Sequence, residues 1–262
     1  MQETTHATAH EIRGILFDKD GTLFDFRKTW LPILLAAAEH IAGDDQALAK
    51  ALAKAGGYDP DSDRFDASGP IAAGNAEDMA DAWRDVLLRY GWADAETHSE
   101  STDGKRLVTP KRAELVAQID TASRETGVTT SVPVTDLYVL FSRLHASGRI
   151  LGLATSDSEE AAHASLRREG IETFFSVVTG YDSPGAAKPS AEVVYTFCRR
   201  TGVRRQNVCV VGDTWHDIEM AKAAGARSIA VLTGAVERES LEPYADIVLP
   251  SIAELPEYLG ID

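Results

Sequence analysis

Three groups of polar residues in this chain combine chemically capable side chains with a position just after an apolar run. The first group is Asp18-Lys19-Asp20-Gly21-Thr22, which follows the run 12–17. Two carboxylates two residues apart can share one metal ion and divide the work, one as nucleophile and the other as general acid and base. Gly21 permits a tight turn that brings the backbone close to a ligand.

The second and third groups follow the runs 150–154 and 208–211. Thr155-Ser156-Asp157 places a hydroxyl beside a helix N-terminus, which offers donors to an anion. In the third group Asp213 and Asp217 stand about one helical turn apart, and carboxylate oxygens suit Mg²⁺. Lys188 can neutralise the charge of a phosphate as a point charge. Together these residue types predict a site for Mg²⁺ and a phosphoryl group.

The elements that must position these groups alternate along the chain. Short apolar runs predict buried strands at 12–17, 150–154, 175–179, 208–211, 228–232 and 247–249. Helical patterns predict helices at 136–146, 159–169, 191–201 and 216–224. Strands alternating with helices of this length indicate an α/β fold with a parallel sheet. Ligands bind at the carboxyl ends of such strands, so we expect the polar groups to meet there.

Residues 27–133 follow a different pattern. They carry helical periodicity at 30–41, 44–55, 76–90 and 110–126, loop-like composition at 59–70 and 93–110, and no convincing strand. We therefore predict a core domain formed by 11–26 and 134–262, and a helical domain at 27–133 inserted after the first strand. Residues 1–10 are polar and predict a disordered tail rather than a secretory signal.

The polar groups, in their order along the chain, resemble the four motifs of the haloacid dehalogenase-like (HAD) phosphohydrolase superfamily. The matching residues are Asp18-x-Asp20-Gly21-Thr22, Thr155, Lys188-Pro189 and Gly212-Asp213-x-x-x-Asp217. The resemblance spans nearly all of the predicted sheet domain. It implies a Rossmann-like parallel-sheet core with an inserted all-helical cap of the C1 type, and it is nearest to phosphoglycolate phosphatases.

The resemblance also implies a role for each matched residue. Asp18 would attack phosphorus to form an aspartyl-phosphate, and Asp20 would protonate the leaving group and then activate water. The implied Mg²⁺ ligands are Asp18, the backbone carbonyl of Asp20, Asp213, and Asp217, the last through water or by orienting Lys188. The implied phosphoryl-binding groups are the Thr155 side chain, the Ser156 amide and Lys188.

Asp20 bears on the reaction type. Family members that cleave a carbon–halogen bond lack this second aspartate, since a halide leaving group needs no proton, so its presence favours phosphate ester chemistry. Lys19 stands where an aliphatic or aromatic residue is often found in the family, and we expect its side chain to be solvated or paired.

Caps of this type close over the site and exclude water. Candidate substrate contacts in the insertion are Arg27, Lys28, Trp30 and the loop 68–75.

Composition limits the class of protein. With 26 Lys and Arg against 41 Asp and Glu in 262 residues, the net charge of −15 disfavours binding to nucleic acid or to anionic lipid. No apolar run reaches the roughly 18 residues of a membrane span. Cys198 and Cys209 form no metal-type cluster, which favours a reducing cytoplasm. We expect a cytoplasmic, Mg²⁺-dependent phosphatase that acts on a small phosphorylated metabolite.

Two alternatives stay open on the sequence. One is a sugar phosphomutase resembling β-phosphoglucomutase, and the other is a non-catalytic binding protein on the same fold. The intact set of motif residues disfavours the second. Nothing in the sequence identifies the substrate or the oligomeric state.

Overall fold

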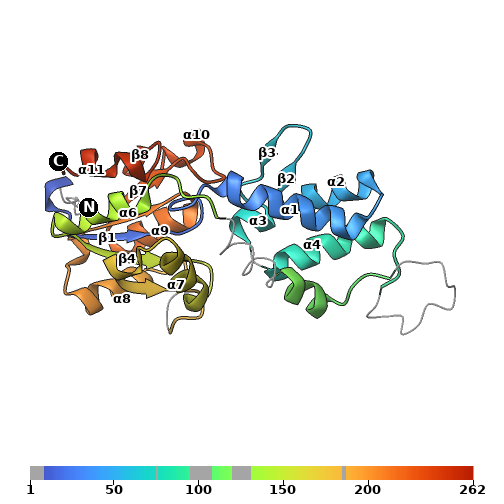
Figure 1. Cartoon of the computed structure of the whole chain (residues 1–262), viewed down its shortest axis with the longest axis horizontal. Coiled ribbons are helices and arrows are strands. Elements are labelled where there is room, and N and C mark those ends of the chain that lie inside the picture. Colours follow the sequence, from blue (N-terminus) through green and yellow to red (C-terminus); the bar gives the residue numbers. More distant parts are fainter. Residues whose placement is uncertain (1–8, 75, 95–107, 120–130, 185–186, 262) are drawn as a thin grey trace. The chain divides into compact units, whose positions relative to one another are not determined.

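The computed structural model describes residues 9–74, 76–94, 108–119, 131–184 and 187–261 (Figure 1). The chain divides into two units, which we call the core unit (Met1–Arg27 with Ser131–Asp262) and the inserted unit (Lys28–Thr130). The predicted tail over residues 1–8 and the part of the predicted helix at 120–126 lie outside the described residues.

A six-stranded sheet forms the centre of the core unit. Its order is β5-β4-β1-β6-β7-β8, and every neighbouring pair is parallel. The strands are β1 (Gly14–Phe17), β4 (Ile150–Ala154), β5 (Phe175–Thr179), β6 (Val208–Gly212), β7 (Arg227–Val231) and β8 (Ile247–Leu249). Each predicted strand is present, with ends shifted by two residues at most, and the predicted α/β fold class is confirmed.

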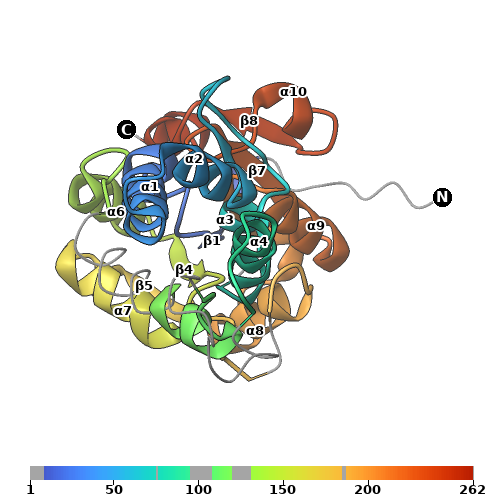
Figure 2. The ribbon, with the colours of Figure 1, turned by 90° about the vertical axis from the view of Figure 1, so that its right-hand side faces the viewer.

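Helices cover both faces of this sheet. Figure 2 shows α6 and α7 on one side and α8 and α9 on the other. The longer helices are α6 (Leu137–Ala146), α7 (Glu159–Arg168), α8 (Glu192–Thr201) and α9 (Trp215–Ala224); α10 (Arg238–Leu241) and α11 (Leu255–Tyr258) are short. Single 3₁₀ turns lie at Ala9–Glu11, Glu172–Phe174, Arg205–Asn207 and Ile252–Glu254.

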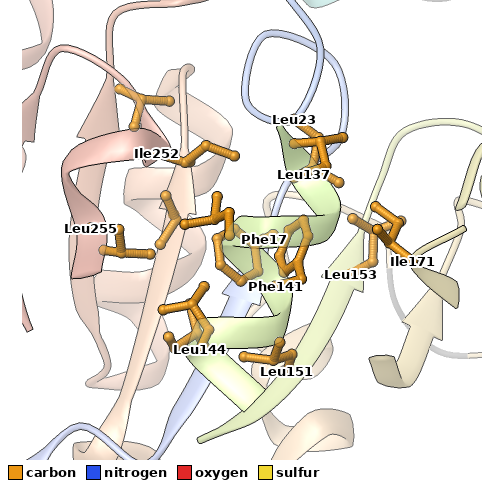
Figure 3. Packing of buried hydrophobic residues seen from close by; sticks show 14 of the residues in the cluster. Phe17, Leu23, Leu137, Phe141, Leu144, Leu151, Leu153, Ile171, Ile252 and Leu255 are labelled. Atoms are coloured by element: carbon orange, nitrogen blue, oxygen red, sulfur yellow. The ribbon is translucent and has the colours of Figure 1, made fainter. Parts of the chain in front are cut away.

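Alternate side chains of the strands build two hydrophobic cores. On one face, Phe17 of β1 packs edge-on against Phe141 of α6, with ring centres 5.2 Å apart (Figure 3). On the other face, Leu16 packs with Phe197 of α8 and Met220 of α9. Because β1 is buried on both faces between β4 and β6, its carboxyl end is held firmly within the sheet.

The inserted unit has its own hydrophobic core. Its helices are α1 (Phe26–Ala42, which starts in the core unit), α2 (Gln46–Ala55), α3 (Pro70–Ala73) and α4 (Ala76–Arg89), and residues 112–119 are also helical. Trp83 of α4 is buried and donates from Nε1 to the carbonyl of Leu52 on α2 at 3.0 Å. Among the residues that the structure describes, no helix is long and apolar enough to cross a membrane.

The inserted unit also contains a small hairpin. Strands β2 (Tyr58–Asp59) and β3 (Arg64–Phe65) pair antiparallel within and just before the stretch predicted as loop. Two residues per strand give no alternation of apolar and polar side chains, so the sequence pattern could not reveal this pairing.

The two segments that connect the units pair with each other within the core unit. The amide of Asp25 donates to the carbonyl of Val132 at 2.8 Å, and that of Val134 donates to Leu23 at 3.0 Å. Phe24 forms an antiparallel bridge with Pro133 between these bonds. The turn after β1 is therefore braced by the segment through which the chain returns to the core.

Candidate active site

The sheet topology brings the three predicted polar groups to one edge. Phe17, the last residue of β1, is in register with Leu153 of β4 and Val211 of β6. The amide of Asp18 extends this ladder by donating to the carbonyl of Val211 at 2.8 Å. Asp18 thus emerges at the carboxyl end of the sheet, between the loops that follow β4 and β6.

A buried lysine joins two of the predicted carboxylates. Lys188 Nζ donates to Asp18 Oδ1 and, at 2.8 Å, to Asp217 Oδ1. Burial lowers the pKa of Lys188, but the nearby Asp18 and Asp217 carboxylates outweigh that effect and raise it above its usual range. Lys188 therefore stays a cation beside Asp18.

The carboxylates nevertheless exceed the positive charge around them. Burial raises the pKa of Asp18 to about 6, despite the opposing effect of Lys188. Burial, together with the charges of Asp18 and Asp217, raises the pKa of Asp213 well above its usual range. Three buried acids around one lysine hold surplus negative charge, which a bound cation would neutralise.

The residues at this edge fit a hard divalent cation. Carboxylate oxygens of Asp18, Asp213 and Asp217 all lie within 4.8 Å of one another, and oxygen ligands suit Mg²⁺. Two glycines leave room around Asp213: a Cβ on Gly21 would lie 2.3 Å from its carboxylate, and one on Gly234 would lie 1.8 Å away. Three of the four predicted metal residues thus gather through their side chains.

The fourth, Asp20, directs its carboxylate elsewhere. Its Oδ2 lies 2.6 Å from Lys19 Nζ, and Asp20 is absent from the acidic cluster. The family resemblance implies that Asp20 binds the metal through its backbone carbonyl oxygen. The contact of its side chain with Lys19 is compatible with that role.

The start of α9 fixes Asp217. Its Oδ2 accepts from the amide and hydroxyl of Thr214, at 3.2 and 2.7 Å, in a capping box. Gly212 permits this approach, since a Cβ there would lie 2.1 Å from the Asp217 carboxyl carbon. With Oδ2 accepting from Thr214 and Oδ1 accepting from Lys188, Asp217 is placed for one of the two roles that the sequence left open, that of orienting Lys188.

The loop after β4 forms the other side of the site. The amide of Thr155 donates to the carbonyl of Thr179 at 2.9 Å, which extends the ladder between β4 and β5. The buried hydroxyl of Thr155 accepts from the amide of Asp157 at 3.1 Å. Ser158 caps α7 by accepting from Ala161 N at 3.2 Å. Ser156 is exposed, next to this helix N-terminus.

The loop after β7 also contributes to the site, and no sequence motif marks it. Thr233 donates from Oγ1 to the carbonyl of Gly21 at 2.6 Å, and Gly234 lies against Asp213. Thr233 and Gly234 come just after a strand, as the three polar groups do. That position is the sequence feature that could have indicated their place in the site.

The partners of Lys19 likewise do not follow from the motifs. The side chain is buried and contacts Asp20 and, at 3.0 Å, Asp157. Burial lowers the pKa of Lys19, but Asp157 and Asp20 reverse this and raise it above its usual range. A lysine in the place of an apolar residue was the only sequence signal. Its partners depend on how two loops approach each other, which spacing does not encode.

Curated relatives align with about half of their own length. The chain is 35% identical over 121 residues to the phosphoglycolate phosphatase of Salmonella paratyphi A, covering 45% of this chain and 47% of the relative. It is 35% identical over 105 residues to that of Chromobacterium violaceum (40% and 46%) and 33% identical over 119 residues to that of Escherichia coli (45% and 47%).

Solved structures resemble the chain over nearly its whole length. A predicted phosphoglycolate phosphatase from Haemophilus somnus has a TM-score of 0.68 at 19% identity, with 94% of this chain and 97% of that one covered. CbbY from Rhodobacter sphaeroides, solved in complex with phosphate, has a TM-score of 0.58 at 21% identity (95% and 100%). At these identities the likeness shows the fold.

The family follows from a broader match. The family model of the haloacid dehalogenase-like hydrolases matches residues 12–225, which contain all four motifs and the insertion. The match agrees with the parallel sheet and with the motif residues gathered at its edge. This chain therefore belongs to the haloacid dehalogenase-like hydrolase family.

Proposed function

We propose that this protein is a Mg²⁺-dependent phosphatase that hydrolyses a small phosphorylated metabolite through an aspartyl-phosphate on Asp18. The observation that carries the proposal is the buried group at the carboxyl end of the sheet. There Asp18 is bonded to a cationic Lys188, with Asp213 and Asp217 within reach of a shared cation. Phosphoryl transfer needs positioning and charge neutralisation, and this group supplies both.

The first half-reaction transfers the phosphoryl group to the enzyme. An oxygen of Asp18 attacks phosphorus, and the bond from phosphorus to the leaving oxygen breaks. Asp20 gives its proton to that oxygen. Lys188, the Thr155 hydroxyl and the Ser156 amide bind the phosphoryl oxygens. Asp18, Asp213 and the Asp20 carbonyl would hold Mg²⁺, which would supply charge neutralisation. Asp217 would reach the ion through water or orient Lys188.

The second half-reaction restores Asp18. A water attacks the phosphorus of the aspartyl-phosphate, Asp20 accepts a proton from that water, and the bond from phosphorus to Asp18 breaks. Inorganic phosphate leaves, and Asp20 is again protonated for the next cycle. Use of a covalent intermediate replaces one difficult step by two easier ones.

Phosphoglycolate is the first substrate to test. The curated relatives are named phosphoglycolate phosphatases, and the alignment with them covers less than half of this chain. We assign residues 27–133 as the cap domain that selects the substrate and 11–26 with 134–262 as the catalytic domain. A cap excludes water and contacts the leaving group, so substrate choice depends on its side chains.

We place the enzyme in the cytoplasm. Support comes from its two cysteines, which are both free thiols, Cys209 being buried. Burial raises the pKa of the Cys209 thiol to about 12, so that this thiol is unreactive. An unreactive buried thiol is compatible with a structural role in a reducing compartment.

A screen of phosphate release tests this function. The purified protein is incubated with phosphoglycolate, sugar phosphates and nucleotides, with Mg²⁺ and with EDTA. We expect Mg²⁺-dependent release of phosphate from at least one small monoester. Release that persists in EDTA would contradict the metal role.

The same samples test the two alternatives. A phosphomutase would convert a hexose 1-phosphate into its isomer with no net release of phosphate, which chromatography of the products detects. A binding protein would bind Mg²⁺ in a titration and release phosphate from no compound in the panel.

A further inference from the structure

Lys19 is a buried lysine beside the proposed acid and base, and the proposed reaction gives it no role. Its side chain is 1% exposed, with Nζ 2.6 Å from Asp20 Oδ2 and 3.0 Å from Asp157 Oδ2. The same ammonium lies 5.7 Å from the centre of the Phe24 ring, within cation–π distance. A long side chain that meets two carboxylates and an aromatic face has little rotational freedom left.

Asp157, the second partner of this lysine, has a side chain that is 35% exposed but a backbone that is held in place. The amide of Asp157 donates to Thr155 Oγ1 at 3.1 Å, and its carbonyl accepts from the amide of Tyr181 at 2.9 Å. Gly180 permits the close packing of the two loops, since a Cβ there would lie 2.6 Å from the Asp157 carbonyl oxygen. The carboxylate of Asp157 therefore extends from a backbone that is held on both sides.

The backbone of Lys19 holds the turn that carries Asp20. The Lys19 carbonyl accepts from the amide of Leu23 at 2.8 Å, and the Gly21 amide donates to Phe24 at 2.8 Å. The Asp20 side chain is 21% exposed, so water competes for its position unless another group holds it. Lys19 is one such group, because its buried ammonium lies 2.6 Å from Asp20 Oδ2.

We propose that Lys19 is a positioning residue for Asp20, which it ties to Asp157 so that the Asp20 carboxylate is held ready for proton transfer. The inference rests on the proposed function, in which Asp20 is the acid and base. The family resemblance leads us to expect an aliphatic or aromatic residue at position 19. The contacts of Lys19 are therefore a feature in which this chain departs from the family pattern.

Leaving groups of different basicity reveal the position of Asp20. In the first half-reaction, the bond from Asp18 to phosphorus forms, the bond to the leaving oxygen breaks, and the proton of Asp20 passes to that oxygen. An alkoxide needs this proton, whereas a dinitrophenolate leaves without it. Because kcat/KM reports on steps up to leaving-group departure, a displaced Asp20 lowers kcat/KM for alkyl phosphates and spares the aryl phosphate.

The test compares Lys19→Met with the unaltered protein on both kinds of substrate. The alkyl phosphate is the best monoester from the phosphatase screen, and the aryl phosphate is 2,4-dinitrophenyl phosphate. We expect kcat/KM to fall about 10-fold or more for the alkyl phosphate and less than about 3-fold for the aryl phosphate. Lys19→Arg, which keeps a cation, should restore part of the loss, and Asp157→Asn should show a smaller loss of the same kind.

The matched control is Lys222→Met. Lys222 is exposed and lies 5.8 Å from the centre of the Tyr244 ring, so it makes the same aromatic contact outside the site. The Lys222→Met substitution should leave kcat/KM unchanged for both the alkyl and the aryl phosphate. Thermal unfolding of every variant, followed by circular dichroism, separates lost positioning from a lost fold.

The double variant Lys19→Met/Asp20→Asn shows whether Lys19 acts through Asp20. If it does, the lysine substitution causes no further loss once Asp20 is removed. Equal losses on both substrates in a folded Lys19→Met variant, no loss at all, or the same loss with and without Asp20 would each overturn the proposal.

Asp20→Asn alone separates this inference from the function on which it rests. If Asp20→Asn reduces hydrolysis of the alkyl phosphate and Lys19→Met does not, the positioning role fails while the phosphatase mechanism stands. If Asp20→Asn itself has no effect, the assignment of Asp20 as acid fails, and the role of Lys19 fails with it.

Discussion

The chemistry proposed for this site depends on a few carboxylates whose surroundings differ sharply. Asp18 and Asp213 are buried, and their pKa values are raised, chiefly by burial. Asp20 stands at the edge of the same site and contacts a lysine. The sequence motifs identified these residues, since spacing after a strand is enough to place them. They could not show that Lys19 turns inward, because that depends on a residue 138 positions away, Asp157.

Removing the proposed nucleophile, Asp18, should nearly abolish turnover. In Asp18→Asn the amide is a poor nucleophile of nearly the same shape, so the fold should survive while hydrolysis falls by roughly 10³-fold or more. Steady-state phosphate release measures the loss, and circular dichroism checks the fold. Retention of Mg²⁺-dependent hydrolysis of an aryl phosphate by this variant would show that the mechanism is wrong.

The raised pKa values predict how pH and Mg²⁺ affect stability together. In the metal-free protein the pKa of Asp18 is about 6, against 3.8 for an ordinary aspartate, so the folded state binds more protons between these values. The stability that Asp18 contributes is therefore present at low pH and is lost as pH rises through about 6. Mg²⁺ competes with these protons and binds best when the carboxylates are ionised.

Thermal unfolding with and without Mg²⁺ checks this coupling. The rise in Tm on adding Mg²⁺ should be large at about pH 8 and small at about pH 5. Asp213→Asn should remove most of the rise at the higher pH. A rise that is equal at both pH values, or that survives in Asp213→Asn, would count against the cation site.

At the scale of elements, the site depends on the parallel order of β4, β1 and β6 and on the turns that follow them. The strands and longer core helices follow from apolar runs and helical periodicity, so the sequence predicts them well. Short features escape such patterns. The β2–β3 hairpin has two residues per strand, and Thr233 and Gly234 form no motif of their own.

Alanine variants of two glycines distinguish the effect of backbone strain from the effect of crowding at the cation site. Gly21 and Gly148 have nearly the same left-handed φ, +79° and +78°, but a Cβ on Gly21 would meet Asp213, while one on Gly148 would meet nothing within 4 Å. Gly148→Ala should cost about 1 kcal/mol of folding free energy through backbone strain alone, and Gly21→Ala should cost more, because its Cβ must also displace Asp213. Gly21→Ala alone should also weaken Mg²⁺ binding, by about 10-fold or more in calorimetric titration. Equal Mg²⁺ affinity in the two variants would contradict the crowding argument.

At the scale of the whole molecule, the chain is strongly acidic, with a net charge of −15, yet it is proposed to bind a phosphate anion. The proposed site would resolve this conflict locally. Lys188, the proposed Mg²⁺ and a helix N-terminus would act on the phosphate at short range, whereas the more distant charges of the protein are screened by salt. The sequence also predicts an inserted domain, since strand patterns stop before residue 27 and resume after residue 133. Which substrate the insertion selects does not follow from periodicity, because selection depends on individual side chains.

The separate hydrophobic cores predict that the inserted unit can be weakened without harm to the cation site. Leu52 is fully buried in the core of the inserted unit, whereas Asp18, Asp213 and Asp217 all belong to the core unit. Leu52→Ala should lower the free energy of unfolding by about 2–5 kcal/mol in urea denaturation. Its Mg²⁺ affinity should match that of the unaltered protein. A large loss of affinity would mean that the cation site needs residues of the inserted unit.

Mass spectrometry of acid-quenched protein tests most directly whether Asp18 carries the phosphoryl group. Asp20→Asn slows the release step, so the phosphorylated form should accumulate when this variant is mixed with Mg²⁺ and an aryl phosphate. We expect one added phosphoryl group, on the peptide that contains Asp18, and none in Asp18→Asn/Asp20→Asn. A phosphoryl group on another residue, or turnover by the unaltered protein with no modified form in either protein, would contradict it.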